Sequence, residues 1–143
     1  MEPSAADTGS ALPFRPGFRI DVIDTLVLVA GAAGSLVAAR TEWWMGALIA
    51  FAVGHFFLFC NVVRMARPLE LGWSALFVTL SASTIVTGQP GWAIALGASL
   101  ACTLAVVVIQ LRRPSYHGIA WQRINPQLPA WWEAHGGLPV RSR

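Results

Sequence analysis

His55 is the residue whose position most strongly suggests chemistry, because it lies inside a long apolar run. The run extends from Trp43 to Val63, carries no formal charge when the imidazole is neutral, and places His55 about twelve residues from its start. An ionisable side chain at that depth in a membrane is costly and is by default a functional hypothesis. Two interpretations remain open. One is a metal ligand, tetrapyrrole ligand or proton relay, and the other is a neutral imidazole hydrogen-bonded to a Ser or Thr of a neighbouring helix.

A cofactor held by His55 would find few further ligands in this chain. Haem b bound by two histidines would need a second intramembrane histidine, but His117 and His135 both lie in the C-terminal tail. A five-coordinate haem or a chlorophyll-type ligand would need only one. Cys102 is expected at a similar depth, yet one histidine and one cysteine are too few ligands for zinc. The sequence therefore requires no cofactor, predicts no metal site, and leaves a haem- or chlorophyll-type ligand at His55 as a hypothesis.

A second group of polar residues is predicted at one end of the apolar runs. Its members lie at the start of the first run, at the end of the second, and in the connection that follows. An ion pair between Asp24 and Arg64 would neutralise two charges at the edge of the hydrocarbon layer. Snorkelling arginines that anchor the protein at the interface are one interpretation. The alternative is a site for an anionic or quinone-like headgroup, in a small transporter or membrane enzyme. The members are Asp24, Asn61, Arg64, Arg67 and Glu70.

Recognisable catalytic motifs are missing from the sequence. It contains no nucleophile–base pair, no glycine-rich phosphate loop, no Cys-x-x-Cys and no His-Glu-x-x-His. No acidic residue is expected in the middle of the membrane, which disfavours a proton-coupled exporter. The sequence therefore predicts no catalytic residue and favours a protein that is not an enzyme.

The elements that must position these residues are four apolar runs. Only 12% of the residues are charged and the mean hydropathy is +0.57, whereas a soluble domain carries about 25% charged residues. About 20 helical residues cross a hydrocarbon layer about 30 Å thick. An all-α membrane protein with four transmembrane helices is predicted, with tails at 1–20 and 112–143 and a membrane domain at 21–111. The helices are expected at about 22–39, 43–63, 71–87 and 91–111.

The connections and the arginines predict the topology. Each connection is short, so neighbouring helices are expected to form antiparallel hairpins. With four crossings, nine arginines fall on the side of the two termini and only Arg40 falls on the other side. The positive-inside rule then places both termini in the cytoplasm. We expect the protein to span the inner membrane of a bacterial cell. Because the arginines flank apolar runs, the pI of about 9.7 does not indicate nucleic-acid binding.

Small residues recur at helical spacing and predict close helix packing. Rows at four-residue spacing expose the backbone to a neighbouring helix. They are Gly46, Ala50 and Gly54 in the second run and Ala93, Gly97 and Ala101 in the fourth.

The C-terminal tail combines tryptophans with prolines. The prolines exclude one long helix, and the tryptophans favour contact with an apolar surface. Either the tail lies on the membrane face or it docks on another protein through aromatic anchors. The tryptophans are Trp121, Trp131 and Trp132.

These patterns favour an accessory, non-catalytic subunit of a larger and energy-transducing membrane complex. Its expected partners are the lipid bilayer and other membrane-protein subunits. The alternatives are the tetrapyrrole-binding protein that uses His55 and the transporter or enzyme that uses Asp24, Asn61 and Arg64.

Overall fold

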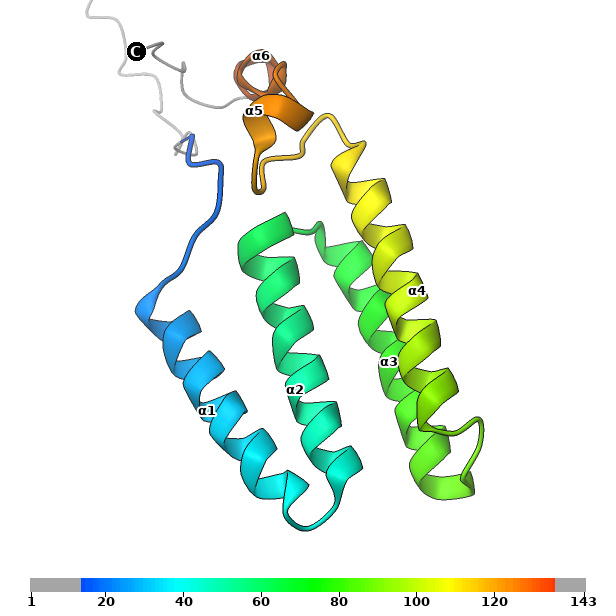
Figure 1. Cartoon of the computed structure of the whole chain (residues 1–143). Coiled ribbons are helices and arrows are strands. Elements are labelled where there is room, and N and C mark those ends of the chain that lie inside the picture. The colour runs from blue at the N-terminus through cyan, green and yellow to red at the C-terminus, as the bar shows by residue number, and fades with distance from the viewer. Residues whose placement is uncertain (1–13, 136–143) are drawn as a thin grey trace, which may run out of the picture.

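The computed structural model of the chain describes residues 14–135, and this range is all-α (Figure 1). Helix α1 packs against α2, and α3 packs against α4, so that the long helices form two antiparallel hairpins side by side. The prediction of an all-α chain with four long apolar helices packed in pairs is confirmed. The elements are α1 (Val22–Ala39), α2 (Trp43–Phe57), the π-helical turn η1 (Leu58–Val63), α3 (Arg67–Thr87), α4 (Trp92–Leu111), α5 (Trp121–Ile124) and α6 (Leu128–Ala134).

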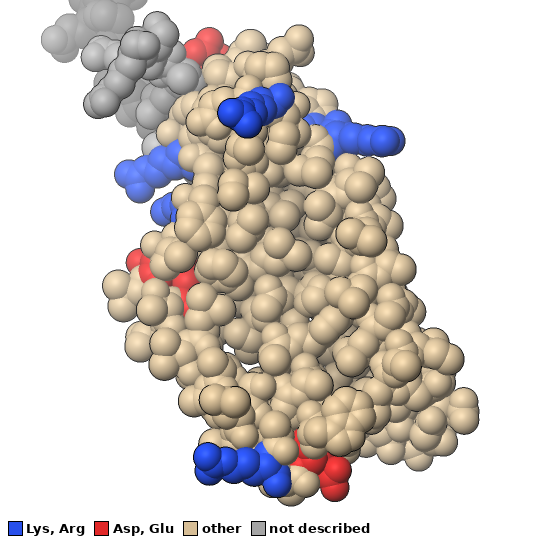
Figure 2. Space-filling model, viewed as in Figure 1, with Lys and Arg blue, Asp and Glu red and all other residues tan. Residues whose placement is uncertain are grey.

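The surface of the four long helices is suited to a lipid environment. Each span, with η1 counted as the continuation of α2, is long and apolar enough to cross a membrane. Helix α1 has no buried residue, although most of its side chains are apolar. Exposed apolar surface on this scale is far larger than the few hundred Å² that a soluble monomer tolerates. In Figure 2 the basic side chains lie towards the two ends of the molecule, and an acidic patch lies on its flank. The chain is therefore a multi-pass membrane protein in contact with the lipid bilayer.

Helix α3 begins at Arg67, four residues before the apolar run that indicates it. Pro68 is compatible with the first turn, where its missing N–H would have had no partner. Arg67 and Glu70 form an ion pair with 3.7 Å between Nη1 and Oε2. Because this first turn is polar, the apolar pattern places the start of the helix four residues too late.

Glycines set the distance between α1 and α2. A Cβ added to Gly46 would lie 2.5 Å from the Cβ of Ala39 and 2.6 Å from the backbone oxygen of Ser35. A Cβ added to Gly31 would lie 2.7 Å from a methyl group of Val53. The hydroxyl of Ser35 donates a hydrogen bond of 2.7 Å to the carbonyl of Gly46. The helices therefore approach at backbone distance, as small residues permit in lipid.

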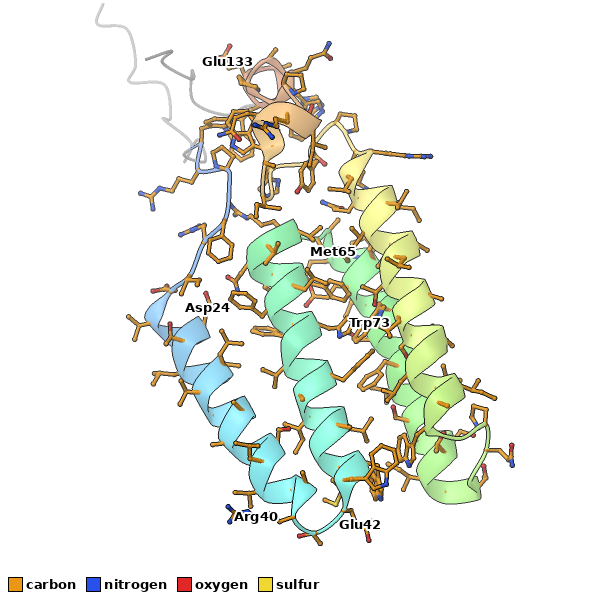
Figure 3. All side chains as sticks on the ribbon, in the orientation of Figure 1. Asp24, Arg40, Glu42, Met65, Trp73 and Glu133 are labelled. Carbon is orange, nitrogen blue, oxygen red and sulfur yellow. The ribbon has the colours of Figure 1, made fainter. Side chains whose placement is uncertain are left out.

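Aromatic rings join the two hairpins. Trp73 lies between them (Figure 3) and stacks on His55 of α2 with ring centroids 4.5 Å apart. Its Nε1 donates to the hydroxyl of Thr103 at 2.8 Å and to the carbonyl of Ser99 at 3.0 Å, both in α4. One side chain from α3 thus contacts α2 and α4 together, with its polar atom satisfied in an apolar interior.

Candidate functional site

Polar residues and arginines converge at one end of the helix bundle, called the basic end here. It comprises the N-terminal segment 14–20, the loop 64–66 that follows η1, the start of α3 and the cap, which is residues 112–135. Seven of the eight arginines in the described range belong to these segments, and the remaining one, Arg40, lies at the other end (Figure 3).

The cap is attached to η1 through backbone groups. The N–H of Ile119 donates to the carbonyl of Val62 at 2.8 Å. This bond satisfies one of the carbonyls that a helix leaves open at its C-terminal end. Tyr116 is fully buried, and its hydroxyl donates to the carbonyl of Ile119 at 2.8 Å. Burial raises the pKa of Tyr116, so the phenol keeps the proton that it donates. Between them, Gly118 lies directly against the backbone of η1.

The N-terminal segment is held by both the cap and the end of η1. The N–H of Gly17 donates to the carbonyl of His117 at 2.8 Å. The Nη1 of Arg64 donates to the carbonyl of Arg15 at 2.6 Å. Arg64 itself adopts the left-handed conformation, with φ of 53°. Three stretches that are distant in sequence therefore meet at Arg64 and His117.

Asp24 and Asn61 do come together, but Asp24 does not pair with Arg64. With the Asn61 amide in the orientation that satisfies its neighbours, Nδ2 donates to the Asp24 carboxylate at 2.9 Å and to the Arg19 carbonyl at 3.0 Å. The same carboxylate accepts the backbone N–H of Asp21 at 2.9 Å and thereby caps α1. Within the described range no ion pair joins Asp24 to Arg64, so the predicted pair is replaced by a helix cap.

Gln110 is a functional-looking residue that the sequence pattern does not single out. It is buried at the end of α4, where its Oε1 accepts the N–H of Ala66 at 3.3 Å and its Nε2 donates to the carbonyl of Arg64 at 3.2 Å. One amide thus satisfies one N–H and one carbonyl of the loop between the hairpins. A polar residue in the last turn of an apolar run was the only available signal.

The tail tryptophans pack within this chain. Phe14 makes edge-on contacts with Trp121 and Trp132, with ring centroids 5.6 and 5.7 Å apart. Trp131 stacks on His135 at 4.1 Å. Two of the three predicted docking residues therefore hold the cap to the N-terminal segment, and docking on a partner stays a prediction for the tail.

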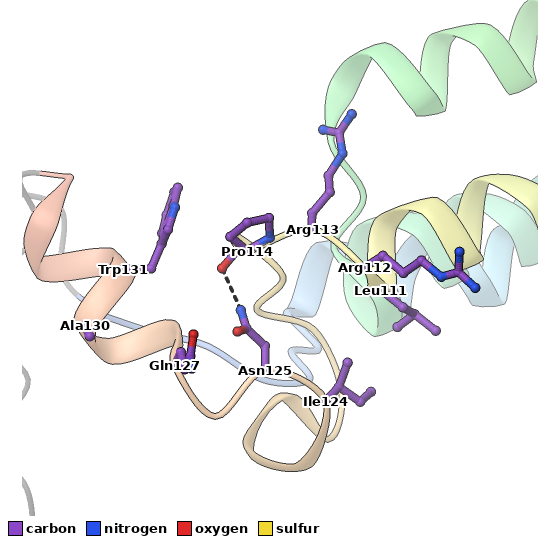
Figure 4. A pocket seen from close by; sticks show the side chains of 9 residues that line it. All are labelled: Leu111, Arg112, Arg113, Pro114, Ile124, Asn125, Gln127, Ala130 and Trp131. Carbon is purple, nitrogen blue, oxygen red and sulfur yellow. Dashed lines mark hydrogen bonds between the residues drawn. The ribbon is translucent and has the colours of Figure 1, made fainter.

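Cavities open around the basic end. One of about 910 Å³ lies between the end of α4 and helices α5 and α6, where Asn125 donates to the carbonyl of Pro114 at 2.6 Å (Figure 4). Two smaller cavities of about 320 and 300 Å³ lie on the start of α3 and on the N-terminal segment, respectively. Arg64 and His117 line both smaller cavities. We regard these two as the more informative, because charged groups converge on them.

Burial and mutual repulsion disfavour positive charge at this place. Burial lowers the pKa of Arg64, and the neighbouring Arg19 lowers it further. Burial also lowers the pKa of His117, and Arg64 adds to this effect, while the hydrogen bond from its Nδ1 to the Ser115 carbonyl opposes it. His117 is therefore neutral around pH 7, and its protonation would add a fourth cation beside three arginines.

We expect His117 to make the folded state less stable in acid. Because its folded-state pKa lies below the ordinary 6.5, the unfolded chain binds the proton more tightly. The folded state is then fully favoured above pH 6.5 and loses stability as the pH falls below that value. His117→Gln should flatten this dependence below pH 6.5, compared with the wild type in thermal unfolding. Identical pH profiles for the two proteins would contradict it.

His55 is buried among aromatic rings. Besides stacking on Trp73, it lies 4.1 Å from the ring of Phe51 and has Phe59 edge-on at 5.6 Å. Its Nδ1 is 2.8 Å from the carbonyl of Phe51, to which it donates in the matching tautomer. The partner is thus the backbone of its own helix one turn earlier, and not a Ser or Thr of another helix. Within the described range no group of three His, Cys, Asp or Glu is placed to hold a metal, and a ligand at His55 stays a prediction.

The small-residue rows divide into an inner and an outer part. Gly46 is buried against α1, whereas Ala50 and Gly54 line a groove on the α1–α2 hairpin with a volume of about 390 Å³. A Cβ added to Gly54 or Gly97 would meet nothing within 4 Å. The complete row on α4 points outward, and its members are Ala93, Gly97 and Ala101.

Comparison of the chain with protein-family models, with curated proteins and with solved structures finds no match.

Proposed function

We propose that this protein is a non-catalytic accessory subunit of a larger membrane complex in a bacterial inner membrane. In this proposal both termini and the basic end face the cytoplasm, as the distribution of arginines favours. The other end carries Arg40 and Glu42 in a short turn, and Trp44 and Trp92 stack there with ring centroids 5.0 Å apart. Tryptophan at that level suits the opposite membrane interface.

The observation that carries the proposal is the outward row on α4. Small residues on a lipid-exposed helix make fewer van der Waals contacts with lipid, but they let another helix approach at backbone distance. Within the described residues no segment of this chain covers Gly97. The groove beside Ala50 and Gly54 offers a second surface of the same kind. Both surfaces match the requirements of a helix from another subunit.

The test is recovery of partners from the membrane. The tagged full chain, extracted in mild detergent after crosslinking, should carry other membrane proteins in constant ratio. Gly97→Leu should reduce that recovery about tenfold or more, because the added side chain blocks close approach. Gly72→Leu is the matched control, since Gly72 is also exposed with nothing within 4 Å of an added Cβ but belongs to no row of small residues.

Two results would refute this function. The first is recovery of the wild type alone, or only with copies of itself, in amounts that show it to be intact. The second is equal recovery of partners with Gly97→Leu and with the wild type. A parallel loss in Gly72→Leu would show that bulk on any outward face matters, and would also count against a specific contact on α4.

A further inference from the structure

The cavity of about 300 Å³ on the N-terminal segment is surrounded by cations. Three of its lining residues are arginines, namely Arg15, Arg19 and Arg64, and the neutral imidazole of His117 forms a further part of the wall. Aromatic rings from Phe14 and Trp132 form much of the remaining wall, and none of the lining residues is acidic. The cavity lies apart from the outward α4 row on which the proposed function rests.

The positive charge in this cavity has little compensation from residues 14–135, the part that the structure describes. Arg64 is half-buried, and the described residues give its guanidinium a single hydrogen bond, from Nη1 to the carbonyl of Arg15. A carbonyl accepts one of the five guanidinium protons and neutralises no charge. Two carboxylates at this end already have partners. Asp24 accepts from Asn61 and from the backbone of Asp21, and Glu70 pairs with Arg67. Like charges gathered at a partly desolvated place are costly unless a counter-charge joins them.

A donor on the cavity wall also lacks an acceptor. The Nε1 of Trp132 is buried and has no hydrogen-bond partner among the described residues. Buried indole N–H groups usually find an acceptor. The site as folded is therefore short of both negative charge and acceptor oxygens, and one anionic oxygen-bearing group would supply both.

The geometry points to a binding site for a phosphate group in this cavity. Arginine forks bind phosphate oxygens in pairs, and several arginines suit a group that offers three or more oxygens. The volume is at the lower end of the range of about 300–1,000 Å³ for small-molecule sites, which suits a small phosphorylated group. Arg64 directly follows Val63, the last residue of a candidate membrane span, so the site lies at the depth of lipid headgroups. The phosphate can therefore come from an acidic phospholipid or from a free phosphate compound.

The test uses the full chain in a neutral detergent and two probes. Inorganic phosphate is titrated by calorimetry, and phosphatidylglycerol is compared with phosphatidylcholine by native mass spectrometry. Arg64→Gln and Arg19→Gln should each weaken binding about tenfold or more, because each removes a charged fork. Arg112→Gln is the control, since Arg112 is exposed at the same end but lies outside this cavity. This substitution changes the net charge by the same amount as the other two. Arg19→Gln keeps the test decisive if Arg64→Gln unfolds.

The arms of the experiment separate the two sources of phosphate. Binding of inorganic phosphate that depends on Arg19 supports the site with a free compound as its ligand. Preference for phosphatidylglycerol that depends on Arg19 supports it with a lipid headgroup. The site is refuted if neither probe binds or if Arg112→Gln weakens binding as much as Arg19→Gln. It is also refuted if succinate, a dianion without phosphate, displaces the bound probe as well as inorganic phosphate does. None of these results depends on whether a partner subunit is found.

Discussion

Gly118→Ala should release the cap from the helix bundle. The added Cβ would lie 2.5 Å from the carbonyl oxygen of Val63 and 2.8 Å from that of Val62. Both atoms belong to the backbone, so neither can rotate away as a flexible side chain could. The cap would have to move outward and lengthen the hydrogen bond from Ile119 to Val62, which is 2.8 Å in the wild type. Overpacking of this kind costs about 1–3 kcal/mol.

The readout for Gly118→Ala is cleavage by trypsin after Arg123, inside the cap. If the cap is destabilised by about 1.4 kcal/mol, the fraction of molecules with a detached cap rises about tenfold. The cleavage rate rises by the same factor when the cap opens and closes faster than trypsin cleaves. Gly72→Ala is the control, because an added Cβ there meets nothing within 4 Å. Cleavage of Gly118→Ala at the wild-type rate would show that the cap does not rest on the end of η1 as described.

Gly46→Ala is expected to separate α1 from α2. Its Cβ would collide with the Cβ of Ala39 and the backbone oxygen of Ser35, so the helices must part along their length. Parting also breaks the hydrogen bond from the Ser35 hydroxyl to the Gly46 carbonyl. We expect a loss of about 1–3 kcal/mol in unfolding titrations in mixed micelles. Ser35→Ala should cost less, about 0.6 kcal/mol, because it removes only the hydrogen bond.

Gly34→Ala provides the control for this hairpin. Gly34 lies on the same helix as Ser35, but an added Cβ there meets nothing within 4 Å. If Gly34→Ala destabilised the protein as much as Gly46→Ala, a change in lipid contact would explain the effect, because Ala favours a helix more than Gly does. The close approach of α1 and α2 would then not be its cause. Unchanged stability in Gly46→Ala would refute the contact itself.

The fold could be predicted from the sequence because lipid solvation imposes a simple rule. Backbone groups must be satisfied within each span, so long apolar runs become helices, and short connections make hairpins. The start of α3 at Arg67 was missed for the complementary reason that its first turn is polar. The π-helical turn η1 and the left-handed Arg64 leave no mark on an apolar pattern, because they arise from the local balance of backbone hydrogen bonds.

The site could be predicted only in part. Asn61 and Asp24 lie within hydrogen-bond distance because both fall at the same end of adjacent helices, but a functional role for this cluster stays a prediction. The pairing of Arg64 was wrong, since its partner is a backbone carbonyl of the N-terminal segment and such contacts have no sequence signature. Gln110, Gly118 and His117 depend on how the cap folds back on η1. The spacing of residues along the chain does not predict contacts between segments that lie so far apart in sequence.

The central claim is that the chain crosses the membrane four times with the basic end in the cytoplasm. Its most direct test labels single cysteines in intact cells of a bacterial host with a membrane-impermeant maleimide. In a background of Cys60→Ala and Cys102→Ala, reporters are placed at Thr41→Cys, in the turn between α1 and α2, and at Gln122→Cys, in α5 of the cap. The account predicts labelling of Thr41→Cys in intact cells and of Gln122→Cys only after lysis. The reverse pattern, or labelling of both positions from one side, would contradict it.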